Sequence, residues 1–351
     1  MRSYSDITLI PRFFKGKSRS EIDVSCDFLG KQFKLPVVPA NMSSVLNEDI
    51  AKTLSFGNYF YIMHRFFKEP DGNIKLLRRM NEQSWPIISI SIGVQENDKS
   101  FIKEIAKQKL DVDFITIDIA HGDSQLMKNM IWIIKEYLPK TKIIAGNVCT
   151  PQGAYRLIKW GADCVKIGIA QGGACSTYGK TGFGLPMPLT VWHLYTDWGQ
   201  NRFPIIIDGG IRANGDIAKA IALAYQSSSR LPSTEQIIQN ENGIPEVKDA
   251  ITDIKRNLPE VMVMAGSLFA ACDDSPADRD DYGQKLYYGS ASAKQKGHSK
   301  NVEGFEVMIR GNDMTYVQKL KEIEQDLQSA ASYAGGSIFD LCNVEIVNLN
   351  A

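Results

Sequence analysis

One cysteine lies inside a glycine-rich segment, and it suggests chemistry more directly than any other residue. The segment reads GIAQGGACST from Gly168 to Thr177. Glycines permit positive φ angles and let backbone N–H groups approach an anion or a flat ring closely. A thiol among such small neighbours is accessible to a substrate, which makes Cys175 a candidate nucleophile. The residue types equally allow another interpretation, in which Cys175 is only a small residue in a tight turn.

The glycine-rich segment does not match the common phosphate-binding motifs. The GxxxxGK[ST] spacing of a Walker loop is missing, and no GxGxxG follows the first apolar run. Glycine richness by itself is therefore a weak signal, and the elements that surround it have to supply the argument.

Other small or polar clusters come directly after short apolar runs. The clusters are ANM, DIAHGD, GNV, DGG and GS, and the runs are rich in β-branched residues. Near-continuous apolar runs separated by amphipathic segments indicate the strands of a parallel sheet that helices cover. Eight such runs are present, at residues 37–42, 59–63, 87–93, 114–120, 142–148, 164–169, 204–210 and 261–267.

Several connecting segments have helical features of their own. Ala154, Leu157 and Ile158 have helical spacing before a stop at Gly161, and Asn214 is the expected N-cap of a later helix. Eight strand–helix units favour a closed α/β fold, the (β/α)8 TIM barrel, over an open doubly wound sheet. In such a barrel the chemistry lies at the carboxyl ends of the strands, where the polar clusters fall.

Two segments do not fit the repeat. Residues 226–257 are polar and precede the eighth run, which predicts an inserted helical excursion or a loop. Residues 285–306 are rich in Gly, Ser and Lys and predict a short mobile flap over the barrel mouth. With these two additions we expect residues 1–351 to form a single catalytic domain.

Composition limits the possible partners. The 351 residues include 40 Lys and Arg against 40 Asp and Glu, so net charge favours neither nucleic acid nor an anionic membrane. No stretch approaches the about 18 apolar residues of a spanning helix, and the start has no apolar signal region. Six scattered cysteines without CxxC pairs suit a reducing compartment. We expect a cytoplasmic protein whose partners are small molecules or copies of itself.

The joint order of several blocks resembles the IMP dehydrogenase/GMP reductase family, over essentially the full length from YSDITLIPR to SYAGG. The matching blocks are PVVPANMSSV, IDIAHGD, AGNVCTPQGAYRLIKWGADCVKIGI, GGACST with KTGFG, IIIDGGIRANGDIAKAIALA, VMAGSLFA, YYGSAS and VEG. The resemblance implies a (β/α)8 barrel that binds a purine nucleoside monophosphate and passes a hydride between purine C2 and a nicotinamide. Only about 23 residues separate the second and third strands, so no CBS-type regulatory domain is expected.

The resemblance also implies catalytic roles. Cys175 matches the nucleophile that bonds to the electrophilic C2 of the purine. Thr177 and Glu303 match the residues that protonate a leaving amine, and a carboxyl can do so if closure of the site raises its pKa. Without the resemblance, Glu303 could equally be a solvated loop carboxylate.

The implied nucleotide site draws on several strand ends. Asp208 matches the carboxylate that accepts the ribose hydroxyls, although by residue type alone it could cap a turn. The phosphate-binding groups match Gly209, Gly210, Gly266 and Ser267, and Ser267 could otherwise cap the following helix. The remaining substrate-binding residues implied are Asn41, Tyr288, Gly289 and Ser290.

The implied dinucleotide is NADPH, or NAD for a dehydrogenase, and its binding residues match Asp118, His121, Gly122 and Asn147. The glycine-rich turn also resembles a monovalent-cation loop, in which carbonyl oxygens ligate potassium. The corresponding residues here are Ala170, Gly172 and Cys175. Members of the family form homotetramers, and we expect the same of this chain.

The flap separates the two activities of the family. By the resemblance, an IMP dehydrogenase needs a long flap with an Arg-Tyr pair that activates water. Here the residues between Ser290 and Val302 read ASAKQKGHSKN, which is short and lacks that pair. This favours a GMP reductase, which turns GMP and NADPH into IMP, ammonia and NADP. The alternative is an IMP dehydrogenase, which turns IMP, NAD and water into XMP and NADH.

The turn departs from the family pattern at one position. GPGS reads AQGG here, so Gly173 stands where the family has a phosphate-binding serine. Loss of that hydroxyl costs about 0.5 to 1.5 kcal/mol if nothing replaces it. The departure motivates a third hypothesis, a nucleotide-binding paralogue without turnover. Retention of Cys175, Thr177, Asp208 and Glu303 together argues against it.

Overall fold

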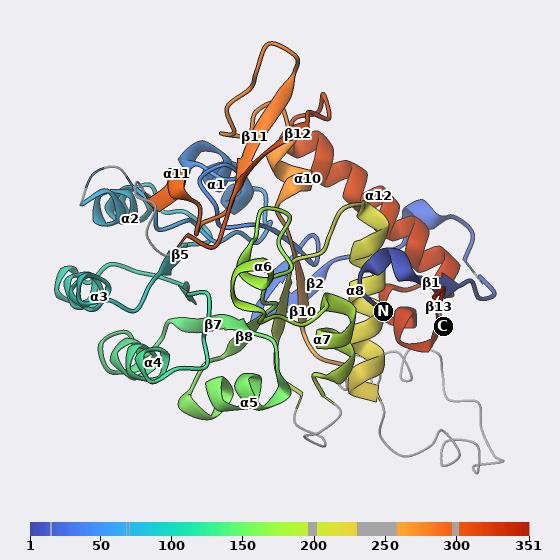
Figure 1. The fold of residues 1–351 in the computed structure, drawn as a ribbon, viewed down its shortest axis with the longest axis horizontal. Helices are drawn as coiled ribbons and strands as arrows, with labels where there is room; N and C mark the ends of the chain where they lie inside the picture. Colours follow the sequence, from blue (N-terminus) through green and yellow to red (C-terminus); the bar gives the residue numbers. More distant parts are fainter. Residues whose placement is uncertain are drawn as a thin grey trace.

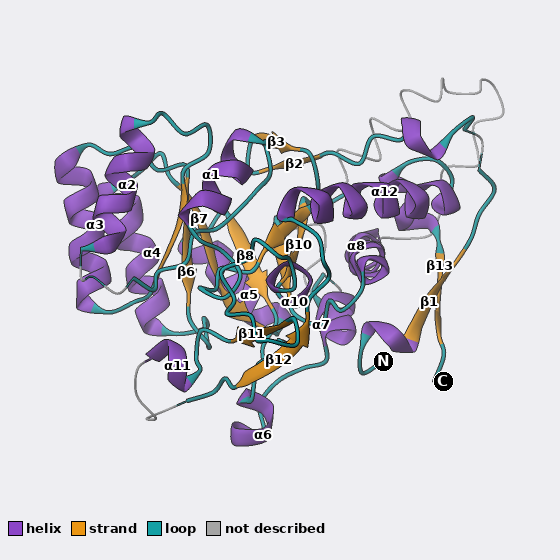
Figure 2. Cartoon of the chain, turned by 90° about the horizontal axis from the view of Figure 1, so that it is seen from above, coloured by secondary structure: helices purple, strands orange, loops and turns teal. Residues whose placement is uncertain are grey.

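A curved, all-parallel β-sheet forms the centre of the molecule, and helices lie outside it (Figures 1 and 2). The computed structural model describes residues 1–14, 16–67, 69, 71–195, 202–229, 258–296 and 302–350. The strands of the central sheet are β4 (Val37–Pro39), β5 (Ser89–Ile92), β6 (Phe114–Asp118), β7 (Lys142–Val148), β8 (Cys164–Ile167), β9 (Ile205–Asp208) and β10 (Val261–Ala265).

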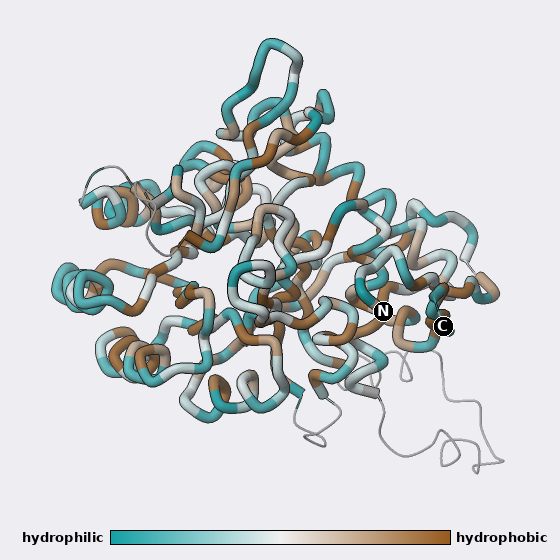
Figure 3. Tube along the Cα trace, viewed as in Figure 1, coloured by the Kyte–Doolittle hydropathy of each residue, from teal (hydrophilic) through white to brown (hydrophobic). Residues whose placement is uncertain are grey.

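The order of the strands is β4-β10-β9-β8-β7-β6-β5, so β4, the first strand of this sheet along the chain, lies beside β10, its last. Each neighbouring pair is parallel. Most strand residues are buried on both faces, as the continuous apolar runs predict. Hydrophobic residues gather along these central strands (Figure 3). The α/β class and the parallel sheet covered by helices are therefore confirmed.

One of the eight predicted strands is not a strand in the structure. Of residues 59–63, only Met63 pairs with a neighbour, through a single parallel bridge to Ile90 of β5 in which its N–H donates to the Ser89 carbonyl at 3.1 Å. The four side chains from Phe60 to Met63 are buried. The apolar pattern was thus correct about burial and wrong about regular pairing, because burial on both sides does not by itself supply a ladder partner.

The helices follow the sheet strands in sequence or pack near the chain ends. They are α1 (Glu48–Phe56), α2 (Gly72–Glu82), α3 (Glu96–Gln108), α4 (Gln125–Tyr137), α5 (Pro151–Trp160), α6 (Thr177–Thr181), α7 (Met187–His193), α8 (Asn214–Ser229), α10 (Ser267–Ala270), α11 (Ala293–Lys296) and α12 (Tyr316–Ala334). Short 3-10 helices are η1 (Tyr4–Asp6), η2 (Arg19–Glu21) and η4 (Ile338–Asn343).

Helix ends agree with the predicted signals at one helix and differ at another. In α5, Gly161 ends the helix at a φ of 110°, as predicted, and Thr150, which was not predicted, caps the first turn. In α8, Asn214 is already helical. The Asp216 carboxylate accepts hydrogen bonds from the N–H groups of Arg212 and Ala213, at 3.0 Å each. At the N-terminus of α8 the backbone is therefore bound by the side chain of Asp216 and not by that of Asn214, the predicted N-cap.

Three small antiparallel pairs lie outside the central sheet. They are β1 (Ile7–Ile10) with β13 (Glu345–Asn348), β2 (Cys26–Phe28) with β3 (Lys31–Phe33), and β11 (Gln284–Tyr288) with β12 (Glu306–Arg310). The β1–β13 pair brings the first and last strands together, near the N and C labels of Figure 1. Within the described residues, no helix has the length and apolar character needed to cross a membrane.

The two segments predicted to interrupt the repeat are described in part. Residues 226–229 continue α8, and the rest of the predicted insertion, 230–257, lies outside the described residues. The predicted flap, residues 285–306, begins in β11, contains α11 and ends at the start of β12, with 297–301 not described. The flap is thus an excursion from a β-hairpin.

Candidate active site

Four predicted site residues, from four strand ends, meet in one hydrogen-bonded cluster, which we call the mouth network. It consists of Asn41, Asp118, Asn147 and Asp208, together with Lys166 of β8, which was not predicted. The Lys166 ammonium donates to Asp118 Oδ1 at 3.0 Å, to Asn147 Oδ1 at 2.9 Å and to Asp208 Oδ2. Asn147 Nδ2 donates to Asp208 Oδ2 at 2.8 Å, and Asn41 Nδ2 donates to Asp118 Oδ2 at 3.1 Å.

Charge balance keeps the mouth network ionised. Burial alone raises the pKa of the Asp118 carboxyl, but Lys166, Arg65 and a hydrogen bond from Asn41 together hold that pKa below its usual value. Burial likewise lowers the pKa of Lys166, and the carboxylates of Asp118 and Asp208 outweigh it, so that pKa is raised. A buried ammonium between two carboxylates therefore stays charged.

Sheet register explains why these groups meet. Asp118 on β6 is in register with Gly146 on β7, and Gly146 with Lys166 on β8. A Cβ atom at Gly146 would collide with the backbone carbonyl oxygen of Lys166 and lie 2.6 Å from the Lys166 Cβ, so only glycine lets β7 approach β8 this closely. The register then shifts between Gly146 and Val148, which leaves Asn147 out of the ladder.

A second chain of hydrogen bonds joins the cysteine loop to the flap. The Cys175 thiol donates to Thr177 Oγ1 at 3.2 Å, and the Thr177 hydroxyl donates to Glu303 Oε2 at 2.9 Å. Cys175 is partly exposed and so reachable from outside. The predicted catalytic residues are thus in contact, although 126 positions separate Thr177 from Glu303.

Backbone pairing fixes the flap against the cysteine loop. The Ser176 N–H donates to the Glu303 carbonyl at 2.8 Å, and the Phe305 N–H to the Ala174 carbonyl at 3.0 Å. Cys175 and Gly304 form an antiparallel bridge, and Lys180 Nζ reaches the Val302 carbonyl at 2.6 Å. The contact between Thr177 and Glu303 therefore rests on main-chain geometry.

The glycines predicted to hold the phosphate lie beside the cysteine loop. The Gly210 N–H donates to the Gln171 carbonyl at 3.0 Å, and a Cβ at Gly209 would lie 2.8 Å from the Gln171 Cβ. At Gly266, an added Cβ would collide with the hydroxyl of Tyr287. The Tyr287 ring also approaches Gly173, at 3.7 Å from its ideal Cβ position.

Tyr287, which sequence reasoning missed, thus reaches the strand end where a phosphate is expected, whereas Tyr288 does not. Tyr288 Oη lies 3.3 Å from Ser43 Oγ, on the other side of β11. Alternation along the strand could have indicated that neighbouring tyrosines face opposite ways, but not which way each faces.

The remaining predicted residues differ in how closely they join the site. Gly289 lies against the Ala174 carbonyl, 3.2 Å from an ideal Cβ. The Gly122 N–H donates to the Asn147 carbonyl at 2.7 Å. His121 is exposed. The pKa of the Asp123 carboxyl is held below its usual value chiefly by Arg156 and more weakly by His121. Of the predicted residues, Ser267 opens α10, and Ser290 follows Gly289 without a described hydrogen bond.

The loop predicted to hold potassium carries carbonyl oxygens in unusual backbone positions. Ala170 has a left-handed φ of 65°. The Gly172 carbonyl accepts the Cys175 N–H at 3.1 Å, and the Ala170 carbonyl accepts Gln171 Nε2 at 3.2 Å. Each carbonyl keeps a second lone pair, so the donor set is compatible with a hard cation. Within the described residues, His, Cys, Asp and Glu form no cluster of three or more suited to a metal.

Lys166 is the most central residue that sequence reasoning missed. A lysine within the apolar run CVKIGI was a usable signal, because lysine is almost never fully buried without partners. Its partners lie on other strands, so the signal predicts a buried ionic site but not its members.

Comparisons with known proteins place the chain in a family. The IMP dehydrogenase/GMP reductase domain matches residues 1–228. A GMP reductase from Staphylococcus carnosus is 43% identical over 343 residues, which cover 96% of this chain and 92% of that protein. GMP reductases from Bacillus licheniformis and Staphylococcus aureus are each 42% identical, covering 98% and 95% of this chain and 94% and 91% of their own.

Proposed function

This chain belongs to the IMP dehydrogenase/GMP reductase family, and from that premise we propose that it is a GMP reductase. The reaction takes GMP, NADPH and a proton to IMP, ammonia and NADP+. The observation that carries the proposal is the hydrogen-bonded chain from Cys175 through Thr177 to Glu303. It joins a nucleophile to a carboxylate through a hydroxyl, as removal of an amine from C2 requires.

In the proposed mechanism, the Cys175 sulfur attacks C2 of GMP and the C2–amine bond breaks. The thiol proton passes by way of the Thr177 hydroxyl and the Glu303 carboxyl to the amine, which leaves as ammonia. A bound NADPH would supply the hydride that reduces C2. The C–S bond then breaks, IMP is released, and the Cys175 sulfur takes up the one proton that the reaction consumes. Main-chain pairing of the flap to the cysteine loop keeps Glu303 within reach of Thr177.

We assign the nucleotide to the β9 and β10 strand ends. Asp208 accepts the ribose hydroxyls, and Gly209, Gly210, Gly266 and Ser267 face the phosphate. Tyr287 supports this end, since its hydroxyl stands against Gly266. A carbon of the same ring lies 3.7 Å from the ideal Cβ position of Gly173, and we propose that the nearby Tyr287 hydroxyl takes the role of the serine hydroxyl expected there. Base contacts in this proposal come from Asn41, Tyr288, Gly289 and Ser290.

The dinucleotide is assigned to the β6 and β7 strand ends. Asp118 and Asn147 would face it, with His121 and Gly122 on the adjoining loop, and NADPH is the expected form. Potassium would bind the carbonyls of Ala170, Gly172 and Cys175 and would support the cysteine loop. In this proposal the dinucleotide supplies only the hydride named above, and potassium takes no part in a catalytic step.

Closure of the barrel, domain organisation, location and assembly belong to the same proposal. Residues 59–63 would occupy the eighth position of a closed (β/α)8 barrel, because Met63 bridges the free side of β5 while β4 ends the sheet on its other side. The chain would form one catalytic domain, act in the cytoplasm and assemble as a homotetramer. Light scattering of the purified protein tests the last point.

The decisive experiment is a paired absorbance assay at the nicotinamide band, run in one buffer. GMP should be required for oxidation of NADPH, and Cys175→Ala should abolish it. Glu303→Gln should slow release of ammonia far more than it weakens GMP binding. If IMP drives reduction of NAD faster than GMP drives oxidation of NADPH, the chain is an IMP dehydrogenase. Binding of GMP without turnover would identify a non-catalytic paralogue.

A further inference from the structure

Lys166 lies at the centre of the proposed site, yet none of the ligand-binding roles assigned above includes it. Its side chain is 4% exposed. An ammonium has three donors, and here they point to Asp118, Asn147 and Asp208. Lys166 therefore has no donor left for a ligand, so any influence on function must act through its three partners.

We propose that Lys166 is a positioning residue shared by both halves of the site, which holds Asp208 for the nucleotide and Asp118 for the dinucleotide with one ammonium group. The inference rests on the proposed function, because that function assigns the two carboxylates to two different ligands. It deepens the proposal by making binding of both ligands depend on one side chain that neither ligand touches.

The hydrogen bonds orient the Asp208 carboxylate. Its Oδ2 accepts from both Lys166 and Asn147, whereas its Oδ1 receives no hydrogen bond from the described part of the chain. Asn147 is itself held by the Gly168 carbonyl, at 2.7 Å from Nδ2. The Asp208 side chain is 23% exposed, so the free oxygen can meet a hydroxyl donor.

The Asp118 carboxylate is held at both oxygens. Lys166 occupies Oδ1 and Asn41 occupies Oδ2, which leaves one lone pair on each oxygen for a dinucleotide hydroxyl. The Asp118 side chain is 14% exposed. Its orientation therefore depends on the same ammonium that orients Asp208.

Removing the ammonium would change the charge state as well as the geometry. Two carboxylates would remain in a largely buried site, with Arg65 as the other cation that acts on Asp118. Burial disfavours the charged form of a carboxyl, so at least one of the two would take up a proton nearer to neutral pH. A protonated carboxyl accepts hydroxyl donors poorly, so ligand binding would then weaken as pH falls.

The test is isothermal titration of GMP and of NADP+, each alone, across about pH 6 to 9. Both titrations use the Cys175→Ala background, because the thiol of Cys175 would otherwise attack C2 of GMP even without a hydride donor. Lys166→Met should weaken binding of both ligands by about tenfold or more at neutral pH, and the loss should shrink as pH rises. If Lys166→Met does not fold, Lys166→Gln keeps a polar side chain without the charge and carries the same expectation.

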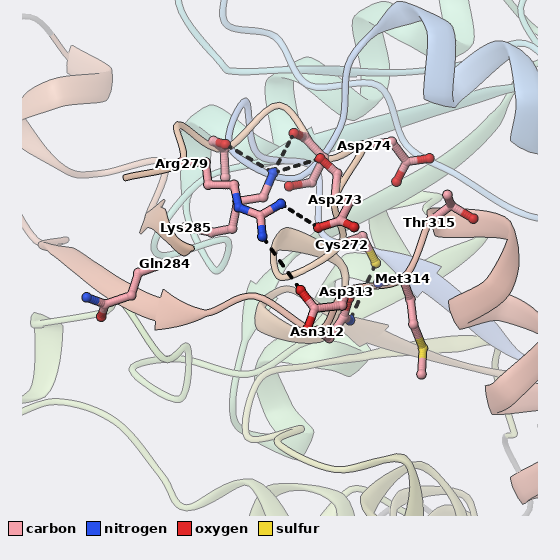
Figure 4. A network of polar contacts seen from close by, with 12 residues as sticks. Cys272, Asp273, Asp274, Arg279, Gln284, Lys285, Asn312, Asp313, Met314 and Thr315 are labelled. Carbon is pink, nitrogen blue, oxygen red and sulfur yellow. Dashed lines mark hydrogen bonds and ion pairs between the residues drawn. The ribbon is translucent and has the colours of Figure 1, made fainter. Parts of the chain in front are cut away.

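Lys285→Met is the matched control. Lys285 is 2% exposed, and its ammonium contacts the carbonyls of Asp273, Ser275 and Ala277 at 3.0, 3.3 and 3.4 Å (Figure 4). The control loses an equally buried ammonium that touches no proposed ligand-binding residue. We expect it to keep both affinities within about twofold and to leave their pH dependence unchanged.

Several results would overturn the inference. Among them are loss of affinity for only one ligand, no loss for either, a loss that is independent of pH, and an equal loss in Lys285→Met. If the wild-type protein binds both ligands but does not oxidise NADPH, the proposed function fails while the titrations still decide the role of Lys166. If it binds neither ligand, both fail.

Discussion

Lys166 and Lys285 are buried almost equally, at 3% and 2% exposed, and their surroundings are opposite in kind. Lys166 meets two carboxylates and an amide oxygen, and the carboxylates raise its pKa despite burial. Lys285 meets three backbone carbonyls, and burial, together with the charge of Arg279, lowers its pKa. A buried ammonium that contacts carboxylate side chains orients groups that can still bind a ligand. A buried ammonium that contacts only backbone carbonyls holds a loop in place.

The surroundings of Lys285 support this distinction. Arg279 pairs with Asp273 at 2.8 Å and with Asp313 at 3.6 Å, and Asn312 Nδ2 reaches Cys272 Sγ at 3.7 Å (Figure 4). These contacts tie the loop before β11 to the loop after β12. They secure the base of the hairpin from which the flap extends, and none of them involves a residue assigned to the proposed site.

The largest effect expected is on the stability of Lys166→Met. Removing one member of a buried ionic group leaves its partners uncompensated, which costs about 3 to 5 kcal/mol in the free energy of unfolding. Urea denaturation at neutral pH measures this loss. A loss as small as that of a surface lysine would mean that Asp118 and Asp208 find other partners, and the contrast with Lys285 would fail.

A smaller effect is expected when the lysine is kept and the close approach of its strand to β7 is disturbed. In Gly146→Ala, the new methyl group would collide with the backbone carbonyl oxygen of Lys166 and lie 2.6 Å from the Lys166 Cβ. We expect a loss of about 1 to 3 kcal/mol in unfolding free energy, together with weaker GMP binding. Gly215→Ala, where an added Cβ meets nothing within 4 Å, is the control and should bind GMP normally. Normal binding by Gly146→Ala would contradict the inference that the approach of β7 to β8 positions Lys166.

Lys285→Met should cost less stability than Lys166→Met, and it should spare affinity. Three carbonyls would lose a donor, but the loop lies near water that can replace it, so we expect about 1 to 2 kcal/mol. Denaturation and GMP titration on the same preparation measure both quantities. Loss of GMP affinity without loss of stability would show that the hairpin base acts on the site directly.

The smallest effect is the pH dependence of stability, and its sign differs for the two lysines. The pKa of Lys285 is lowered in the folded state, so just below the usual lysine value of about 10.4 the unfolded chain binds the extra proton. Its contribution to stability therefore rises with pH in that window. The pKa of Lys166 is raised, so its contribution is complete below about pH 10.4 and is lost only above.

Comparing each methionine variant with the wild type in urea, at about pH 8 and about pH 10, measures this difference. The stability advantage of the wild type over Lys285→Met should grow with pH. The advantage over Lys166→Met should stay constant or fall. The reverse order would contradict the opposite pKa shifts of Lys166 and Lys285.

Much of the site was predictable because strand ends are visible in the sequence. Asp118, Asn147 and Asp208 each end or nearly end an apolar run, and the carboxyl ends of parallel strands share one edge of a sheet. Their convergence therefore followed from the strand assignment. The contact between Thr177 and Glu303 came from family resemblance, since no local pattern links residues so far apart.

The missed features depend on pairings that local sequence does not encode. Whether Lys166 meets Asp118 depends on the register of three strands, and that register is set by packing of the whole sheet. Which of Tyr287 and Tyr288 faces inward depends on how β11 pairs with β12. The run at 59–63 was recognised as buried, but its backbone partners could not be inferred from its own residues.

Pairing of β1 with β13 has a consequence for synthesis of the chain. Ile7 pairs with Asn348 and Ile10 with Glu345, so β1 has no strand partner until the chain has been synthesised as far as β13. The loop between these two strands is very long, so closing it carries a high entropic cost. The β1–β13 ribbon is therefore expected to be the last piece of regular structure to assemble, after the central sheet has already gathered the residues between them.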